Sequence, residues 1–269
     1  MLKLAVKSIL SKMGYDLYRK GHFNIRWPHD LIGFDGEDEA RSGIGKVRDQ
    51  TMVAYASLVS LWQQIRFCEE RGLVGDYVEC GVWKGGSIGL MALANLAYGS
   101  KRRPIHLFDA FDDICEPDPA VDGERAMAEI EKFAGRDRAS ITGQLTPVKG
   151  IYDHLGGPGQ LEDVKRFLEQ EIGYDAAHLI YHKGWFQDTL PVANISEIAV
   201  LRLDGDWYAS TKVCLEHLYG KVVPGGFVII DDYGCYEGCR KAVDEFLERR
   251  GHKLFLNHVN RDCRYWIKP

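Results

Sequence analysis

Short apolar segments with the length of β-strands alternate with helical segments through most of this 269-residue chain. Strands are expected at 76–80, 104–111, 178–186, 198–204 and 227–231, and helices at 51–71, 87–99, 157–173, 209–219 and 237–250. Such alternation is typical of a mostly parallel sheet with helices on both faces. Two last strands, 252–259 and 263–268, are joined by a short turn and must be antiparallel to each other. The pattern predicts an α/β fold with a Rossmann-like sheet of seven strands, one of them antiparallel.

The composition argues against binding to nucleic acid and against a membrane-spanning segment. The chain has 34 basic and 39 acidic residues and a net charge of −5, which differs from the basic charge of nucleic-acid-binding domains. No apolar run approaches the roughly 18 residues of a membrane span. The seven cysteines form no CxxC pair, and the N-terminus carries no export signal, so reduced thiols and a cytoplasmic location are expected.

The chain divides into an N-terminal part, residues 1–50, and a main domain, residues 51–269. Leu2, Val6, Ile9 and Met13 recur at helical spacing, which predicts an amphipathic helix that docks on the body or on a partner; association with a membrane surface is the alternative. Residues 21–50 are polar and predict an irregular arm. A polar insertion, 112–145, carries a helical patch around 125–133. Long polar segments in a compact fold are often functional, so 22–50 and 112–145 are expected to form a lid.

The first strand is followed by a glycine-rich turn in "VECGVWKGGS". Gly81, Gly85 and Gly86 allow a tight turn and a close approach of a ligand to the backbone. The spacing is not GxGxxG, and the carboxylate of Glu79 at the strand end suits a cationic ligand, such as a sulfonium with an amino-acid tail, better than a pyrophosphate. Ser87 is expected to cap the following helix.

Two further acids follow the second and third strands. Asp109 closes "HLFDAF" and is placed to accept hydrogen bonds from ribose hydroxyls; the alternative is that it caps a turn. Asp188, in "GWFQDTLP", either accepts from an adenine amino group or caps the turn before Pro191. Trp185 and Phe186 either flank the adenine or belong to the core.

The last two parallel strands also end in carboxylates: Asp204 after the fourth, and Asp231 and Asp232 after the fifth. Carboxyl ends of parallel strands meet at one edge of the sheet, where ligands bind in such folds. A lone Asp at a strand end is usually a cap, but crowded like charges are unfavourable unless a cation lies among them. Oxygen ligands favour Mg²⁺, Ca²⁺ or Mn²⁺. The three acids therefore predict a divalent cation site.

Several motifs together resemble the macrocin O-methyltransferase family: "VECGVWKGGS", "HLFDAFDD", "KGWFQDTLP", "LRLDGDWYASTKVCLEHLYGKVVPGGFVIIDDYG" and "GCRKAVDEF". The resemblance runs from about Thr51 to the C-terminus. It implies a class I methyltransferase that moves a methyl group from S-adenosylmethionine to a sugar hydroxyl with the help of Mg²⁺, as relatives do on mycinamicin and novobiocin sugars. It also implies a homodimer. Since the resemblance weakens before Thr51 and in 112–145, the identity of the acceptor stays open: it is an antibiotic deoxysugar, a glycan or glycolipid, or a non-sugar diol.

The resemblance also implies roles for individual residues. Asp206 is the general base. The metal ligands are Asp204, Asp231 and Asp232, and the residues near the methyl donor are Thr51, Met52, Glu79, Gly81, Ser87, Asp109 and Asp188. Two alternatives remain: a nicotinamide-dependent oxidoreductase, which lacks its GxGxxG turn here, and a non-catalytic partner subunit that keeps the fold.

Overall fold

The computed structural model describes residues 32–251 and 253–269. Its centre is a seven-stranded sheet in the order β3-β2-β1-β4-β5-β7-β6. The strands are β1 (Asp76–Cys80), β2 (Ile105–Asp109), β3 (Leu179–Lys183), β4 (Ile198–Leu203), β5 (Val222–Ile230), β6 (Asn257–His258) and β7 (Arg264–Ile267). Only β7 runs against its neighbours β5 and β6 in this part of the chain. The predicted seven-stranded sheet with one antiparallel strand is confirmed.

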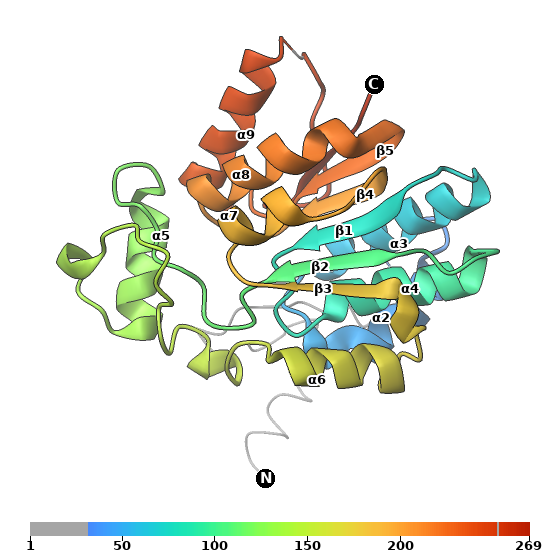
Figure 1. Ribbon diagram of the computed structural model, residues 1–269, viewed down its shortest axis with the longest axis horizontal. Coiled ribbons are helices and arrows are strands. Elements are labelled where there is room, and N and C mark those ends of the chain that lie inside the picture. Colours follow the sequence, from blue (N-terminus) through green and yellow to red (C-terminus); the bar gives the residue numbers. More distant parts are fainter. Residues whose placement is uncertain (1–31, 252) are drawn as a thin grey trace, which may run out of the picture.

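Helices cover both faces of the sheet (Figure 1). On one face lie α2 (Glu37–Val47), α3 (Tyr55–Glu70), α4 (Gly86–Tyr98) and α6 (Leu161–Arg166), and on the other α7 (Phe186–Thr189), α8 (Tyr208–Leu218) and α9 (Glu237–Arg249). A π-helical turn, Phe167–Glu171, extends α6. Short 3₁₀ turns occur at Arg48–Gln50, Arg138–Ser140, Asp153–Leu155, Ala176–His178, Leu190–Val192 and Tyr219–Lys221.

The irregular arm predicted for 21–50 is wrong where α2 forms. Ala40, Ile44 and Val47 lie on one face of this helix and are buried in the core it shares with α3 and α4. Glu37 fixes its start, because the carboxylate accepts hydrogen bonds from the backbone N–H of Gly33 and from the hydroxyl of Tyr55. Three apolar side chains at helical spacing are enough to stabilise a short helix once they are buried against neighbouring helices. The predicted amphipathic helix at the N-terminus lies outside the described residues.

The insertion between β2 and β3 lies beyond the carboxyl ends of β1 and β2 (Figure 1). Its helix α5 (Gly123–Glu129) continues as a π-helical turn, Ile130–Ala134, in agreement with the predicted helical patch. Ala126, Met127 and Ile130 are buried in the same core as α8 and α9. The insertion is therefore packed against the body and forms one wall above the sheet edge.

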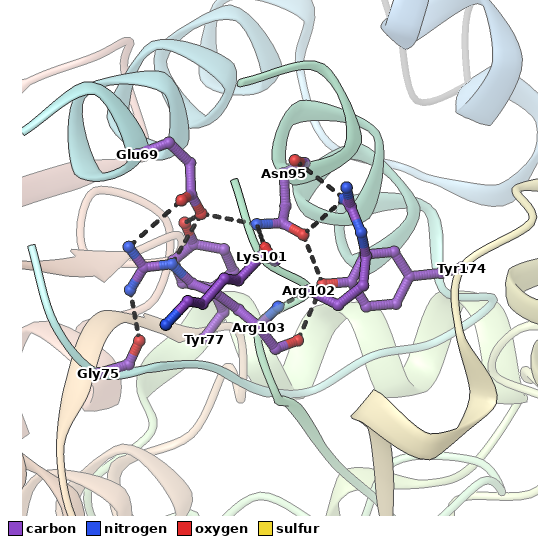
Figure 2. A network of polar contacts seen from close by, with 8 residues as sticks. All are labelled: Glu69, Gly75, Tyr77, Asn95, Lys101, Arg102, Arg103 and Tyr174. Carbon is purple, nitrogen blue, oxygen red and sulfur yellow. Dashed lines mark hydrogen bonds and ion pairs between the residues drawn. The ribbon is translucent and has the colours of Figure 1, made fainter. Parts of the chain in front are cut away.

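A buried polar network holds the opposite end of the sheet (Figure 2). Glu69, at the end of α3, pairs with Arg103 at 2.7 Å and accepts from Asn95 Nδ2 at 2.8 Å. Arg103 also donates to the carbonyl of Gly75 just before β1, and its backbone N–H donates to the hydroxyl of Tyr174. The amino ends of β1 and β2 are thus tied to α3 and α4, which makes a rigid base for the other edge.

Two further features are the lengths of the helices and the state of the cysteines. In the described part of the chain, no helix combines the length and apolar character that crossing a membrane requires. All seven cysteines lie within the described residues and are free thiols.

Candidate functional site

A cavity of about 330 Å³ lies at the carboxyl ends of the strands. Its floor includes Asp109, Asp204, Asp206, Asp231 and Asp232, and its walls come from the insertion, from the segment after β3 and from the β6–β7 turn. A smaller cavity shares some of these residues and adds others from the glycine turn and from the segment before α3; its lining includes Thr51, Met52, Glu79, Gly81 and Ser87. Five of the seven residues predicted near the donor therefore gather in one place.

The glycine turn after β1 is shaped by contacts between backbones. Gly81 has a φ of +92°, and a Cβ there would lie 1.7 Å from the carbonyl oxygen of Asp204. A Cβ on Gly86 would lie 2.5 Å from the carbonyl oxygen of Gln50. Gly81 thus lets the turn after β1 lie directly on the turn after β4, and Gly86 lets the start of α4 lie on the segment before α3. The predicted capping role of Ser87 is wrong, because α4 begins at Gly86 after a left-handed Gly85, and Ser87 is buried inside the helix.

Asp109 lines the larger cavity while it also holds the glycine turn. Its Oδ2 accepts hydrogen bonds from the backbone N–H of Val82 at 2.6 Å and of Trp83 at 3.0 Å, and its Oδ1 accepts from Phe111 at 2.6 Å. The capping alternative is therefore observed. A carboxylate has about four acceptor positions, so these three bonds leave room for another donor. Burial raises the pKa of Asp109, and the three backbone bonds oppose that rise.

Glu79 is 1% exposed and lies beside Arg202 of β4, which is 2% exposed at its side chain. The two residues are register partners in the sheet, and their side chains form an ion pair. Oε1 of Glu79 contacts the guanidinium, whereas Oε2 is buried with no hydrogen-bond partner among the described residues. Burial raises the pKa of Glu79 to about 8, and Arg202 pulls it down. An unpartnered buried acceptor at this point suits a ligand that brings a positive charge or a donor.

The acid cluster is formed by the turns after β4 and β5. Carboxylate oxygens of Asp204, Asp206 and Asp232 lie within 4.8 Å of one another, a spacing that a metal ion can bridge. The backbone N–H of Asp206 also donates to Oδ2 of Asp232 at 3.3 Å. Burial and the neighbouring carboxylates raise the pKa values of Asp206 and Asp232 well above the usual range. A cation among these groups would remove the repulsion that causes part of this rise.

Asp231 is placed differently from the other acids. Its Oδ1 lies 3.0 Å from Nη2 of Arg202 in an ion pair. Burial raises the pKa of Asp231 to about 6, and Arg202 opposes the rise. The structure thus groups Asp206, not Asp231, with Asp204 and Asp232. Asp231 still lines the cavity, so its role as a ligand remains a prediction.

The turn that carries Asp206 is held by two hydrogen bonds to the insertion. Asp206 has a φ of +56°, a left-handed conformation that is uncommon for residues other than glycine. After it, the backbone N–H of Tyr208 donates to Oδ1 of Asp122 at 2.6 Å, and Nε1 of Trp207 donates to the carbonyl of Cys115 at 2.9 Å. Asp122 and Cys115 belong to the insertion. A strained residue held by such contacts is common at functional sites.

The remaining predicted residue, Asp188, is exposed on α7 and lies outside the described lining of both cavities. Its neighbours Trp185 and Phe186 are half-buried and line the larger one. The contact of Asp188 with an adenine is not supported by this placement and stays a prediction.

Sequence reasoning missed two residues that shape the site. Arg202 carried a signal, since it stands two positions before Asp204 in a strand and so points to the same face. Asp122 carried none, because nothing in the polar insertion distinguishes this acid from its neighbours.

Comparison with known proteins identifies the chain. The sequence profile described as macrocin O-methyltransferase (TylF) matches residues 35–135 and 161–268, well over half of the protein. The chain belongs to the macrocin O-methyltransferase family. The resemblance found in the sequence motifs is confirmed, and the matched segments include every acid of the cluster.

Individual macrocin O-methyltransferase relatives cover most of the chain. The 8-demethyl-8-(2,3-dimethoxy-α-L-rhamnosyl)-tetracenomycin-C 4′-O-methyltransferase of Streptomyces olivaceus is 31% identical over 259 residues, 93% of this chain and 90% of the relative. Demethyldecarbamoylnovobiocin O-methyltransferase of Streptomyces niveus is 34% identical over 216 residues, 80% of this chain and 74% of the relative. The structure of the O-methyltransferase NovP superposes with a TM-score of 0.66 at 30% identity and covers 99% of this chain and 97% of that one.

Proposed function

We propose that this protein transfers the methyl group of S-adenosylmethionine to a hydroxyl of a sugar unit in a small molecule, with a divalent cation in the acid cluster. The observation that carries the proposal is the pair of cavities with shared lining residues, one lined by residues predicted near the donor and the other floored by the acids. Family membership and relatives that methylate hydroxyls support the same chemistry.

The smaller cavity fits the amino-acid end of the methyl donor. Oε2 of Glu79 is an unpartnered acceptor within the described residues, and an ammonium group would satisfy it. Thr51, Met52, Gly81 and Ser87 surround the same space. Asp109 has acceptor capacity left for a ribose hydroxyl.

The acid cluster fits a hard divalent cation such as Mg²⁺. Its donor set is all oxygen, and oxygens from Asp204, Asp206 and Asp232 are close enough to share one ion. Asp204 and Asp232 belong to this group, and Asp231 lines the same cavity. These three are the proposed ligands because the family resemblance assigns the metal to them and the role of base to Asp206. A bound cation lowers the pKa of an alcohol oxygen that reaches it and orients that oxygen.

Asp206 is the proposed general base. It lines the cavity beside Asp232, on a turn whose backbone is fixed by the insertion. In this role it takes the proton of the acceptor hydroxyl while that oxygen bonds to the methyl carbon and the carbon–sulfur bond of the donor breaks. Trp207 is buried beside it, and Tyr208 donates its hydroxyl to Glu245 instead of facing the cavity.

One wall of the proposed acceptor cavity is formed by a segment that the family profile does not match. Residues 136–160 fall between the two matched segments, and Ile151, Tyr152, His154 and Leu155 from this range line the cavity. The ring of His154 stacks on Phe133 of the insertion at 4.1 Å. This wall sets which sugar and which scaffold fit. The proposed lid consists of residues 22–50 and 112–145, and its second segment adjoins this wall where Phe133 stacks on His154. Hydrogen exchange that slows in both segments on binding donor and acceptor tests that role.

We also infer a homodimer, from the family resemblance, and a cytoplasmic location, from the seven free thiols. Light scattering at micromolar concentration and cell fractionation test these two points. A nicotinamide-dependent oxidoreductase is disfavoured by family membership, and a non-catalytic subunit by the presence of all the expected acids.

The deciding experiment combines binding and turnover. Calorimetry with S-adenosylhomocysteine, and with NADH as control, should give binding of the first alone. Incubation with S-adenosylmethionine, Mg²⁺ and a panel of glycosides should give a product heavier by one methylene, which EDTA prevents and Mg²⁺ restores. Failure to bind S-adenosylhomocysteine would refute the proposal, and turnover unaffected by EDTA would refute its metal part.

A further inference from the structure

Arg202 has no part in the chemistry proposed above, yet it lies between the proposed donor site and the proposed cation site. It occupies β4 opposite Glu79 of β1, and both side chains are almost fully buried. Side chains two positions apart in a strand share a face, so Asp204 lies on the same face as Arg202. Asp231 follows β5 on the adjacent side. One guanidinium therefore stands among three carboxylates from three neighbouring strands.

The contacts of Arg202 divide between the two sides of the site. Nη1 contacts Oε1 of Glu79 and donates to Oδ2 of Asp204 at 2.8 Å, whereas Nη2 forms an ion pair with Oδ1 of Asp231 at 3.0 Å without the geometry of a hydrogen bond. Each carboxylate thus turns one oxygen toward the arginine. Its second oxygen is then directed elsewhere, and for Glu79 this is the buried Oε2 that lacks a partner in the described structure.

The geometry points to Arg202 as a positioning residue shared by the donor site and the cation site. We propose that it orients Glu79 toward the donor and Asp204 and Asp231 toward the cation at the same time. A guanidinium is planar, permanently charged and carries donors in a fixed fork, so it can hold several carboxylates in defined orientations, which an ammonium cannot. The inference rests on the proposed function, because it assigns Arg202 to those two ligands.

If Arg202 acted through its charge alone, its replacement would change ligand affinity in the opposite direction from that expected if it positions the carboxylates. Arg202 is a cation beside two cation sites, so on charge alone its removal should tighten the binding of both Mg²⁺ and the donor. If it positions the carboxylates, its removal should weaken both. Arg202→Lys sharpens the contrast, because it keeps the charge but loses the fork; it also avoids leaving three carboxylates buried without a cation.

The test is calorimetry with MgCl₂ and with S-adenosylhomocysteine on Arg202→Lys and Arg202→Gln, after circular dichroism has shown that each is folded. Both Kd values should rise about 10–100-fold in each variant, the usual effect of losing a group that orients metal ligands. Arg103→Lys is the matched control, since Arg103 also pairs with a buried glutamate but at the opposite end of the sheet. It should leave both Kd values unchanged.

Unchanged or tighter binding in the Arg202 variants would overturn the inference, and a change in only one Kd would overturn the shared role. If neither variant folds, Glu79→Asp tests the same link, because it keeps the charge and withdraws the carboxylate from Arg202. Mg²⁺ affinity should then fall although Glu79 lies outside the cluster of Asp204, Asp206 and Asp232 oxygens that could hold a metal ion, and an unchanged Mg²⁺ affinity overturns the inference. Lack of S-adenosylhomocysteine binding by the unmodified protein is a different result, which refutes the proposed function itself.

Discussion

The buried carboxylates predict how the free energy of unfolding depends on pH when no cation is bound. Burial raises the pKa of Glu79 to about 8, with Arg202 opposing, so the folded chain retains a proton there at pH values where the unfolded chain has released it. The unfolded glutamate titrates near its usual pKa of about 4.3. Between these values the folded state binds more protons than the unfolded state, and stability must therefore fall as pH rises.

The interval from pH 6.5 to 7.5 isolates this effect. At lower pH, His182 has the opposite effect on stability. Burial and His106 lower the pKa of His182 to about 4 in the folded chain, whereas an unfolded histidine titrates near 6.5. Between these values the free energy of unfolding rises with pH. The pKa of Asp231, raised to about 6, also lies below the interval. One excess proton on Glu79 gives a slope of about 1.4 kcal/mol per pH unit. The raised pKa values of Asp206 and Asp232 add to it with the same sign.

Thermal unfolding at pH 6.5, 7.0 and 7.5 in EDTA measures this slope. A loss of about 1.4 kcal/mol corresponds to roughly 3–5 °C in Tm for a chain of this size. Saturating Mg²⁺ and S-adenosylhomocysteine should flatten the dependence, because bound cations keep the carboxylates ionised in the folded state. Glu79→Gln should reduce the slope in EDTA. A Tm that stays constant or rises across this interval in EDTA would show that the acids are ionised without any ligand and that burial does not raise their pKa values.

Four substitutions test other parts of the account. Asp206→Asn should lower kcat by about 10²–10⁴-fold with the Mg²⁺ Kd unchanged; a weakened Mg²⁺ Kd in calorimetry would make Asp206 a ligand, as its closeness to Asp204 and Asp232 allows. Asp204→Asn should raise the Mg²⁺ concentration needed for half-maximal turnover, and normal activity in EDTA would contradict this. Gly81→Ala should abolish donor binding or folding, measured by calorimetry and circular dichroism, because its Cβ would meet a backbone oxygen at 1.7 Å. Glu69→Ala should lower the free energy of unfolding in urea by about 3–5 kcal/mol and spare donor affinity, since it leaves Arg103 without its buried partner far from the site.

The alternation of strands and helices along the chain was predictable because local pattern and fold agree there. The segment "DYVEC" was expected at 76–80 and forms β1 with those bounds, since a short run with strand-forming residues between two glycines has few alternatives. Helix α2 was not predicted, because Gly43, Gly45 and several charges surround its apolar residues. A Cβ on Gly43 would lie 2.5 Å from the ring of Trp62, so this glycine permits close packing of α2 on α3. That reason becomes visible only when the neighbouring helix is in place.

The same limit explains which parts of the site were missed. Acids that follow strands are recognisable along the chain; Asp204, Asp231 and Asp232 were predicted in this way, and Asp206 from the family resemblance. Arg202 interrupts an apolar strand, and its meaning depends on the fact that β4 lies between β1 and β5. That adjacency places Glu79 on one side and Asp231 on the other, and it cannot be read from the spacing within any one segment. The crowded acids therefore have two sources of positive charge: a guanidinium built into the sheet, which holds one oxygen of each of three carboxylates, and the proposed exchangeable ion. Because the first is permanent, the site can stay assembled while the second binds and leaves.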